Sequence, residues 1–250
     1  MRIGIAGYGF VGQAHEGVLK DYHDIIISDP AKKMYGDLRH ADAIIVCVST
    51  PQGSHGGCHM DNVYKVIEDS PDVPILIKST ISIEGWDMLK HVFPNKQITF
   101  SPEFLRAATA LEDFKNNNTI LLGGGNTSFW TDIFITAMGK INISIAKPKE
   151  LILTKYACNS FLALKVAYFN QINDLCNTLG VDYEQVRLYT TLDNRIGESH
   201  TTITDERGFG GHCFPKDTEA FVTSSKCVDS NLSILEHAID YNRRIRKGTA

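Results

Sequence analysis

Short apolar runs alternate with amphipathic stretches along the first 147 residues. The apolar runs lie at residues 2–6, 25–28, 43–48, 75–77, 98–100, 119–122 and 141–145. Such short, nearly continuous runs are typical of strands that are buried on both faces of a parallel sheet. Helical periodicity between them, at residues 13–20 and 127–138, predicts the covering helices. We therefore expect an α/β fold with a Rossmann-like, doubly wound, mainly parallel sheet.

The pattern becomes helical throughout after Lys147 and Pro148. Residues 149–179 contain no internal glycine or proline and repeat apolar side chains at helical spacing. A helix of about thirty residues spans roughly 45 Å, which is longer than a small domain needs, so we expect it to pack against a second copy in a homodimer. Further helices are expected at residues 182–191, 218–224 and 232–246. The predicted domains are residues 1–147 and an all-helical domain of residues 148–250.

Composition narrows the class of protein. With 43% hydrophobic and 22% charged residues, the chain can bury an ordinary core, and its net charge of -4 argues against nucleic acid or an anionic membrane as a partner. No secretory leader and no apolar run of about 18 residues is found, so we expect a cytoplasmic protein with reduced cysteines. The segment HGGCH at residues 55–59 lacks a second ligand pair at zinc spacing, so no metal site is expected.

The first turn carries the fingerprint G-x-G-x-x-G, as GYGFVG at residues 7–12. Gly7 permits the tight turn, Gly9 lets a pyrophosphate approach the helix N-terminus, and Gly12 allows close packing of helix on strand. Asp29 lies seventeen residues beyond Gly12, at the end of the second strand. Its carboxylate can bind both ribose hydroxyls and repel a 2′-phosphate, so the sequence predicts NAD rather than NADP.

Polar residues follow the next strands at their carboxyl ends. Thr50, Thr80 and Glu103 each come directly after an apolar run. Taken singly, each can be a cap or a turn residue. Because ligands of open parallel sheets bind outside the carboxyl ends of the strands, we expect all three to converge on the cofactor crevice.

A glycine-rich turn, GFGGHCFPKD at residues 208–217, concentrates the strongest candidate chemistry. Its glycines let backbone N–H groups approach a ligand, and a helix beginning near Pro215, with cationic Lys216, would favour the thiolate of Cys213. The alternative is a tight turn with a buried structural cysteine. Lys155 and Asn159, four residues apart, share one helical face, which is either functional or a solvated stripe.

These segments resemble the UDP-glucose/GDP-mannose dehydrogenase family over nearly the whole chain. The shared motifs, in family order, are GYGFVG (7–12), STP (49–51), KST (78–80), SPEFL (101–105), Lys155 with Asn159, DNRIG (193–197) and GFGGHCFPKD (208–217). The resemblance implies oxidation of the C6 alcohol of a nucleotide sugar to a carboxylate with two NAD. It implies Cys213 as the nucleophile, with Lys155 stabilising the oxyanion, Asn159 assisting, and Asp217 with Glu103 positioning or deprotonating water.

The resemblance also implies binding residues. For the cofactor these are Gly7, Tyr8, Gly9, Phe10, Val11, Gly12, Asp29, Thr50, Thr80, which would lie near the nicotinamide, and Lys216. For the nucleotide sugar they are Phe104, Leu105, Arg106, Lys155, Asn159, Arg195, Gly210 and Gly211. In family members the residue corresponding to Arg195 reaches the substrate of the neighbouring subunit, which agrees with the expected homodimer.

Three features depart from the family pattern. Only thirteen residues separate Asp29 from Ala43, so we expect a shortened sheet edge with fewer contacts to adenosine. Ala107 and Ala108 stand where family members usually have an acidic and a small residue. The family's C-terminal domain, which closes on the nucleotide, would follow Ala250. Two alternatives therefore stay open: a non-catalytic binding protein that keeps the NAD fold, and a single-step alcohol or hydroxyacid dehydrogenase, which leaves Cys213 unexplained.

Overall fold

The computed structural model describes residues 1–53 and 56–246 and consists of two compact units. The N-terminal unit comprises Met1–Gly53 and Cys58–Lys155, and the C-terminal unit holds residues 56–57 and 156–246 of the described chain. The division falls inside the long helix α6 (Pro148–Leu179), whose first residue is the one at which the sequence pattern changes. Each unit has its own apolar core, described in turn below.

The N-terminal unit is built on an eight-stranded sheet among its described residues, in the order β3-β2-β1-β4-β5-β6-β7-β8. The strands are β1 (Arg2–Ala6), β2 (Asp24–Asp29), β3 (Met34–Tyr35), β4 (Ala43–Val46), β5 (Ile75–Ile77), β6 (Ile98–Phe100), β7 (Thr119–Gly124) and β8 (Asn142–Ile145). Strands β2, β1, β4, β5 and β6 are mutually parallel, whereas β3 runs antiparallel to β2, and β7 runs antiparallel to β6 but parallel to β8. The predicted mainly parallel α/β sheet is therefore confirmed.

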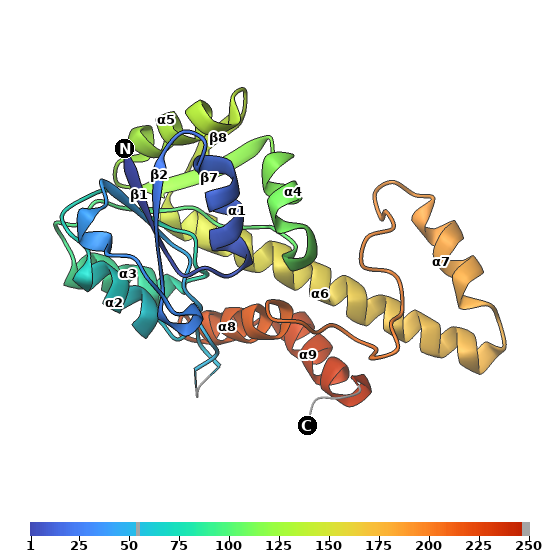
Figure 1. The fold of residues 1–250 in the computed structure, drawn as a ribbon. Coiled ribbons are helices and arrows are strands. Elements are labelled where there is room, and N and C mark those ends of the chain that lie inside the picture. Colours follow the sequence, from blue (N-terminus) through green and yellow to red (C-terminus); the bar gives the residue numbers. More distant parts are fainter. Residues whose placement is uncertain (54–55, 247–250) are drawn as a thin grey trace. The chain divides into compact units, whose positions relative to one another are not determined.

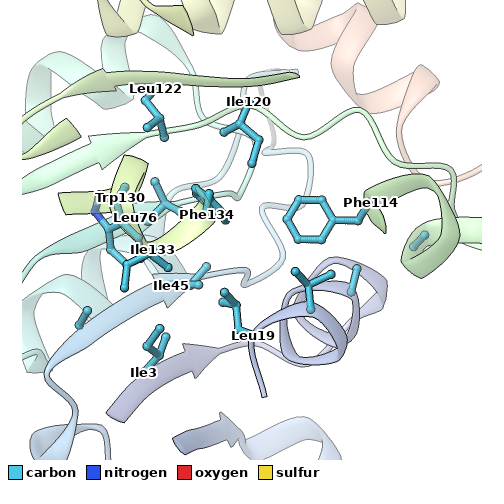
Figure 2. Close-up of a cluster of buried hydrophobic side chains, with 14 residues drawn as sticks. Ile3, Leu19, Ile45, Leu76, Phe114, Ile120, Leu122, Trp130, Ile133 and Phe134 are labelled. Carbon is cyan, nitrogen blue, oxygen red and sulfur yellow. The ribbon is translucent and has the colours of Figure 1, made fainter. Parts of the chain in front are cut away.

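Helices cover both faces of this sheet. They are α1 (Phe10–Leu19), α2 (Asp61–Asp69), α3 (Ile83–Val92), α4 (Ala110–Lys115) and α5 (Thr127–Met138). Helices α1, α4 and α5 bury apolar side chains against β1, β4, β5 and β7, and Figure 2 shows Leu19 and Phe114 turned toward this shared core. Helices α2 and α3 lie side by side elsewhere on the sheet (Figure 1), where the Tyr64 ring is 6.4 Å from that of Phe93.

The sheet edge beside β2 is short. Between Asp29 and Ala43 the chain forms a 3-10 turn (Pro30–Lys32), the two-residue antiparallel strand β3, and a second 3-10 turn (Leu38–His40). Thirteen residues leave no room for a full helix and a parallel strand, because a parallel crossover needs a dozen or more residues of its own. The expected shortened edge is confirmed.

The regular secondary structure of the C-terminal unit is all helical among its described residues, as predicted. It contains most of α6, with α7 (Tyr183–Thr191), α8 (Phe214–Lys226) and α9 (Ser233–Ile245). Phe209, Val222, Leu235 and Ile239 pack with two alanines of α6, and α7 packs through Tyr183 beside the end of α6 (Figure 1). None of the helices in the described part of the chain is long and apolar enough to cross a membrane.

Two predicted helices begin too late. Helix α1 starts at Phe10 rather than Gln13, so the fingerprint's second half is already helical. Helix α8 starts at Phe214 rather than Thr218, because proline is tolerated in the first turn of a helix, where its missing N–H would have no partner. As a result, Lys216 and Asp217 are side chains of the first helical turn and not of a loop.

Candidate functional site

The glycine fingerprint forms a cradle at the N-terminus of α1. A Cβ on Gly12 would lie 2.2 Å from the carbonyl oxygen of Gly7, and one on Gly7, whose φ is +89°, would lie 2.6 Å from that of Cys47. Helix and strand therefore pack directly on these two glycines. At Gly9, the N-cap, a Cβ would meet no protein atom within 4 Å. This open backbone at a helix N-terminus fits the pyrophosphate of a dinucleotide.

Asp29 holds this cradle from the end of β2. One carboxylate oxygen accepts a hydrogen bond from the Tyr8 N–H at 2.7 Å, and the other accepts one from the Lys32 N–H at 3.3 Å. The Lys32 ammonium donates to the Tyr8 carbonyl at 2.6 Å, so a cation lies on the turn beside Asp29. The sequence analysis did not identify Lys32 as part of the cradle. Its position three residues after Asp29, the carboxylate at the end of the strand, could have indicated it.

Phe10 and Val11 are the first two residues of α1 and are half-buried. Their apolar side chains support the cradle by packing and offer no polar group to a ligand. The Tyr8 hydroxyl donates a hydrogen bond to the carboxylate of Glu16 on the same helix. This bond, with burial and the negative charge of Glu16, raises the pKa of Tyr8 to about 12. Tyr8 is therefore a neutral phenol at the rim of the cradle.

Thr50 and Thr80, two of the three residues expected to converge on the cofactor crevice, are joined by a hydrogen bond. The Thr50 hydroxyl donates to the Thr80 carbonyl at 2.8 Å, which joins the loops that follow β4 and β5. The Cys58 thiol donates to the same carbonyl at 3.2 Å, and the Ser79 hydroxyl donates to the Val48 carbonyl at 2.7 Å. The carboxyl ends of these two neighbouring strands are thus fixed by side-chain hydrogen bonds.

Glu103 lies at the end of the next strand and is 7% exposed. Its Oε1 accepts a hydrogen bond from the Phe104 N–H at 2.9 Å, and its Oε2 lies 3.0 Å from the ammonium of buried Lys78. Burial raises the pKa of this carboxyl, but the Lys78 ammonium, supported by His15 and by these hydrogen bonds, outweighs burial and holds the pKa below its usual value. Glu103 is therefore an ionised carboxylate inside the protein.

Lys155 reaches Glu103 from the first part of α6. Its ammonium donates to the Glu103 carbonyl and lies 5.3 Å from the centre of the Phe104 ring. Both Lys155 and Asn159 are buried, at 8% and 7% exposure, so the alternative of a solvated stripe is wrong. Lys155 and Glu103, both predicted from sequence, lie together in the N-terminal unit.

The residues after Glu103 differ in their surroundings. The Phe104 ring is 43% exposed, and Leu105 packs partly against the core between α1, α4 and the sheet. The Arg106 guanidinium is exposed and forms an ion pair of 2.5 Å with Asp113 on α4. Hydrogen bonds from Arg106 hold the pKa of Asp113 below its usual value. The Arg106 guanidinium is therefore held by Asp113, whereas the Phe104 ring is partly open to solvent.

In the C-terminal unit the first turn of α8 carries the predicted acid. Asp217 is fully buried, and its two oxygens accept hydrogen bonds of 2.6 Å from the Asn159 amide and from the Lys216 ammonium. Cys213 is half-buried at the N-cap position of the same helix. The helix N-terminus carries partial positive charge, which favours a thiolate there. Asn159, Asp217 and Lys216 thus form one hydrogen-bonded group, and Cys213 is the N-cap of the helix that carries two of them.

Asn242 of α9 and Arg246, the C-cap of that helix, fix the glycine turn that precedes Cys213. The Asn242 carboxamide accepts from the Phe209 N–H at 2.6 Å and donates to the Phe209 carbonyl at 2.9 Å. The Arg246 guanidinium donates to the Arg207 carbonyl at 2.9 Å, and a Cβ on Gly210 would lie 2.1 Å from its central carbon. The sequence analysis missed the contacts of both Asn242 and Arg246 with this turn, because no local pattern indicates a pairing across more than thirty residues.

A cavity of about 310 Å³ opens beside this turn, within the C-terminal unit. Gly210 and Gly211 line it together with residues of α8 and α9, including Arg243. Arg195 lies in a separate loop after α7, where its guanidinium is exposed and pairs with Asp193 at 2.5 Å. Arg195 therefore lies at the surface in an ion pair with Asp193.

The described residues hold no cluster of three or more histidine, cysteine or carboxylate side chains that fits a metal ion. Of the segment HGGCH, His55 lies outside the described residues. Cys58 donates hydrogen bonds to the Thr50 and Thr80 carbonyls, as a structural cysteine does.

Comparison with known proteins gives matches over both units. Residues 30–134 match the NAD binding domain of the UDP-glucose/GDP-mannose dehydrogenase family, and residues 150–244 match its central domain. A UDP-glucose 6-dehydrogenase of Rickettsia felis is 32% identical over 223 residues, which cover 83% of this chain and 49% of that protein. The chain thus spans about half the length of the curated relatives that it matches.

Solved structures show the same fold. The structure of a UDP-glucose dehydrogenase from Pyrobaculum islandicum, 25% identical, superposes over 97% of this chain and 68% of that one, with a TM-score of 0.84. A 3-hydroxyisobutyrate dehydrogenase of Mycobacterium tuberculosis, 16% identical, covers 97% of this chain and 93% of that one, with a TM-score of 0.73. At 16% identity the latter likeness concerns the fold alone.

Proposed function

Because the chain belongs to the UDP-glucose/GDP-mannose dehydrogenase family, we propose that it serves the NAD-dependent oxidation of a nucleotide sugar at C6, with UDP-glucose to UDP-glucuronate as the leading reaction. One observation carries the proposal. The turn GFGGHCFPKD delivers Cys213 to the N-terminus of α8, and Asp217 in the first turn of that helix is hydrogen-bonded to Asn159. A simple alcohol dehydrogenase has no use for such a thiol, whereas oxidation past the aldehyde does.

The N-terminal unit is the family's NAD-binding domain. Gly9 offers an open backbone to the pyrophosphate, and Asp29 with Lys32 lies where the adenosine ribose is expected. Bound NAD supplies the acceptor for the hydride that leaves C6 in each oxidation. Thr50 and Thr80, at the ends of neighbouring strands, are proposed to border the nicotinamide.

Cys213 is the proposed nucleophile. Its sulfur forms a C–S bond with the aldehyde carbon, and the aldehyde oxygen takes a proton to become the hydroxyl of a thiohemiacetal, from which a second oxidation gives a thioester. Water then adds to the thioester carbon, the C–S bond breaks, and the carboxylate is released with the thiol regenerated. Lys155 and Asn159 are proposed to stabilise the oxyanion, and Asp217 with Glu103 to position or deprotonate water.

NADH formed per nucleotide sugar consumed tests this proposal. We expect two NADH per UDP-glucose. One NADH per sugar would support a single-step alcohol or hydroxyacid dehydrogenase, and none, with NAD binding retained, would support a non-catalytic binding protein. Assays with UDP-glucose, GDP-mannose and UDP-N-acetyl sugars identify the preferred substrate.

Asp29→Asn is expected to weaken NAD binding about 10-fold, because a neutral amide accepts hydrogen bonds from ribose hydroxyls less strongly than a carboxylate. The same change is expected to improve the relative affinity for NADP, since the repulsion of the 2′-phosphate is lost. Titration calorimetry with both cofactors measures this. Lys33→Asn, on an exposed neighbour in the same turn, is the matched control. Unchanged NAD affinity in the Asp29 variant would assign the ribose contact to another residue.

The homodimer is proposed to form through α6. Four of its large apolar side chains are more than half exposed and recur at intervals of seven and four residues, which places them on one helical face: Phe161, Tyr168, Leu175 and Leu179. Exposed apolar stripes of this kind mark protein interfaces. Exposed Arg195 is proposed to contact the substrate of the partner subunit, as the family resemblance implies.

The double substitution Phe161→Glu with Tyr168→Glu is expected to convert the dimer to a monomer, because it places two charges on the proposed apolar interface. Sedimentation equilibrium measures the mass. Tyr22→Glu, at an aromatic residue 52% exposed in the N-terminal unit, is the control that should stay dimeric. A wild-type chain that sediments as a monomer at high concentration would remove the interface and the role of Arg195 together.

A further inference from the structure

Lys78 is a buried cation to which neither the sequence motifs nor the proposed reaction assigns a role. It follows β5, and its side chain is 2% exposed. The ammonium donates to the Ser101 hydroxyl at 2.9 Å and to the Pro102 carbonyl at 3.3 Å, and lies 3.0 Å from Oε2 of Glu103. Lys78 therefore fixes the whole segment after β6 on which Glu103 stands.

Stability alone gives no reason to keep this pair. Removing two charges from water costs several kcal/mol per ion, and replacing a buried ion pair by apolar residues of similar volume is often neutral or stabilising. Buried charges of this kind cluster at functional sites, where they set the protonation of a reacting group. Glu103 has a proposed part in moving a proton, so the charge of its partner Lys78 bears on the reaction.

Lys78 is the cation that acts on the Glu103 carboxylate oxygens. The other groups near the pair are His15 on α1, the Cys47 thiol after β4, and Lys155 on α6. Burial, with the charge of Lys78, lowers the pKa of His15 to about 4, so that ring is neutral at pH 7. Burial raises the pKa of Cys47, so that thiol stays protonated. Lys155 donates to the Glu103 carbonyl and not to its carboxylate.

We propose that Lys78 is a positioning residue for the hydrolytic step: it holds the Glu103 carboxylate fixed and ionised, with Oε2 ready to accept a proton from water. This inference rests on the proposed function. Apart from its ion pair, Oε2 has no hydrogen-bond partner among the described residues, whereas Oε1 is occupied by the Phe104 N–H. Oε2 is thus a buried acceptor with an unsatisfied lone pair, which a bound water molecule would satisfy.

One water proton passes to Oε2, the water oxygen bonds to the thioester carbon, and the C–S bond breaks with its electron pair on sulfur. The products are the carboxylic acid, which ionises in solvent, the Cys213 thiolate and protonated Glu103, which returns its proton to the thiolate or to solvent. Without Lys78, the buried carboxyl would hold a proton beforehand and could not accept another.

The test compares Lys78→Met and Lys78→Gln with Lys78→Arg. In the uncharged variants kcat for UDP-glucuronate formation at pH 7 should fall about 100-fold, the usual contribution of a general base, with KM unchanged. The acid limb of the pH profile of kcat should move up by more than about one pH unit, and Lys78→Arg should restore the wild-type limb. An acid limb at the same pH in all four proteins would overturn the proposal.

A second measurement separates this proposal from the proposed function. If wild-type protein oxidises no nucleotide sugar, the function fails, but the ionisation of Glu103 is still read from its carbon-13 carboxyl resonance, assigned by its loss in Glu103→Gln. The resonance should be that of a carboxylate at pH 6 in wild-type protein and of a neutral acid in Lys78→Met. The same ionised signal in both would refute the role of Lys78. Should Lys78→Met not fold, Lys78→Gln carries the same comparison.

Discussion

Cys213→Ser should abolish steady-state oxidation of UDP-glucose and leave NAD binding unchanged. A serine hydroxyl is a far weaker nucleophile at neutral pH than a thiol placed at a helix N-terminus, so the aldehyde formed by the first oxidation would not be captured. We expect kcat to fall by more than about 1000-fold, the scale seen when an essential nucleophile is removed. Trace aldehyde with at most one NADH per sugar should remain.

Cys227→Ser is the matched control. Cys213 is the N-cap of α8 and Cys227 is its C-cap, so the two thiols stand at opposite ends of one helix dipole. Cys227 is exposed and lies outside the turn GFGGHCFPKD. Its variant should keep wild-type kcat. Rapid-quench assays of NADH and calorimetric titration with NAD measure both effects, and a Cys213→Ser protein with wild-type kcat would eliminate the thioester from the mechanism.

Gly12→Ala and Gly9→Ala should both destroy NAD binding, but for different reasons. The Cβ at position 12 would overlap the Gly7 carbonyl, which is backbone and cannot yield without separating α1 from β1. Overpacking of this kind costs typically about 1–3 kcal/mol, so we expect a lower melting temperature as well as an NAD affinity reduced by more than about 100-fold. The Cβ at position 9 meets no protein atom within 4 Å. The Gly9 variant should therefore keep its melting temperature.

The two variants together distinguish a loss of packing within the protein from a loss of contact between the protein and NAD. Calorimetric titration with NAD and thermal unfolding of the unliganded proteins give the two readouts. A Gly9→Ala variant that binds NAD as tightly as the wild type would show that the pyrophosphate does not approach this backbone. A Gly12→Ala variant with unchanged melting temperature would show that α1 can shift on its strand at little cost.

The sequence alone predicted those parts that are written locally. Strand runs, the glycine fingerprint, the long helix and the turn before Cys213 each depend on residues that are close together in the sequence, where periodicity and backbone preference carry the information. The errors in the predicted helices lie at the helix ends. The start of α8 was placed four residues late because a proline suits both a loop and a first helical turn, and the sequence does not distinguish them.

Pairing between distant side chains was decided only by the tertiary structure. Asn159 and Asp217 are 58 residues apart, and Phe209 and Asn242 are 33 apart. The hydrophobic periodicity around each of these residues does not indicate which distant residue it contacts. The sequence marks Glu103 as a strand-end acid, but its ionised state depends on Lys78, which follows a neighbouring strand. Periodicity determines which side chains are buried, whereas the order of strands in the sheet determines which buried charges meet, and that order is a property of the whole fold.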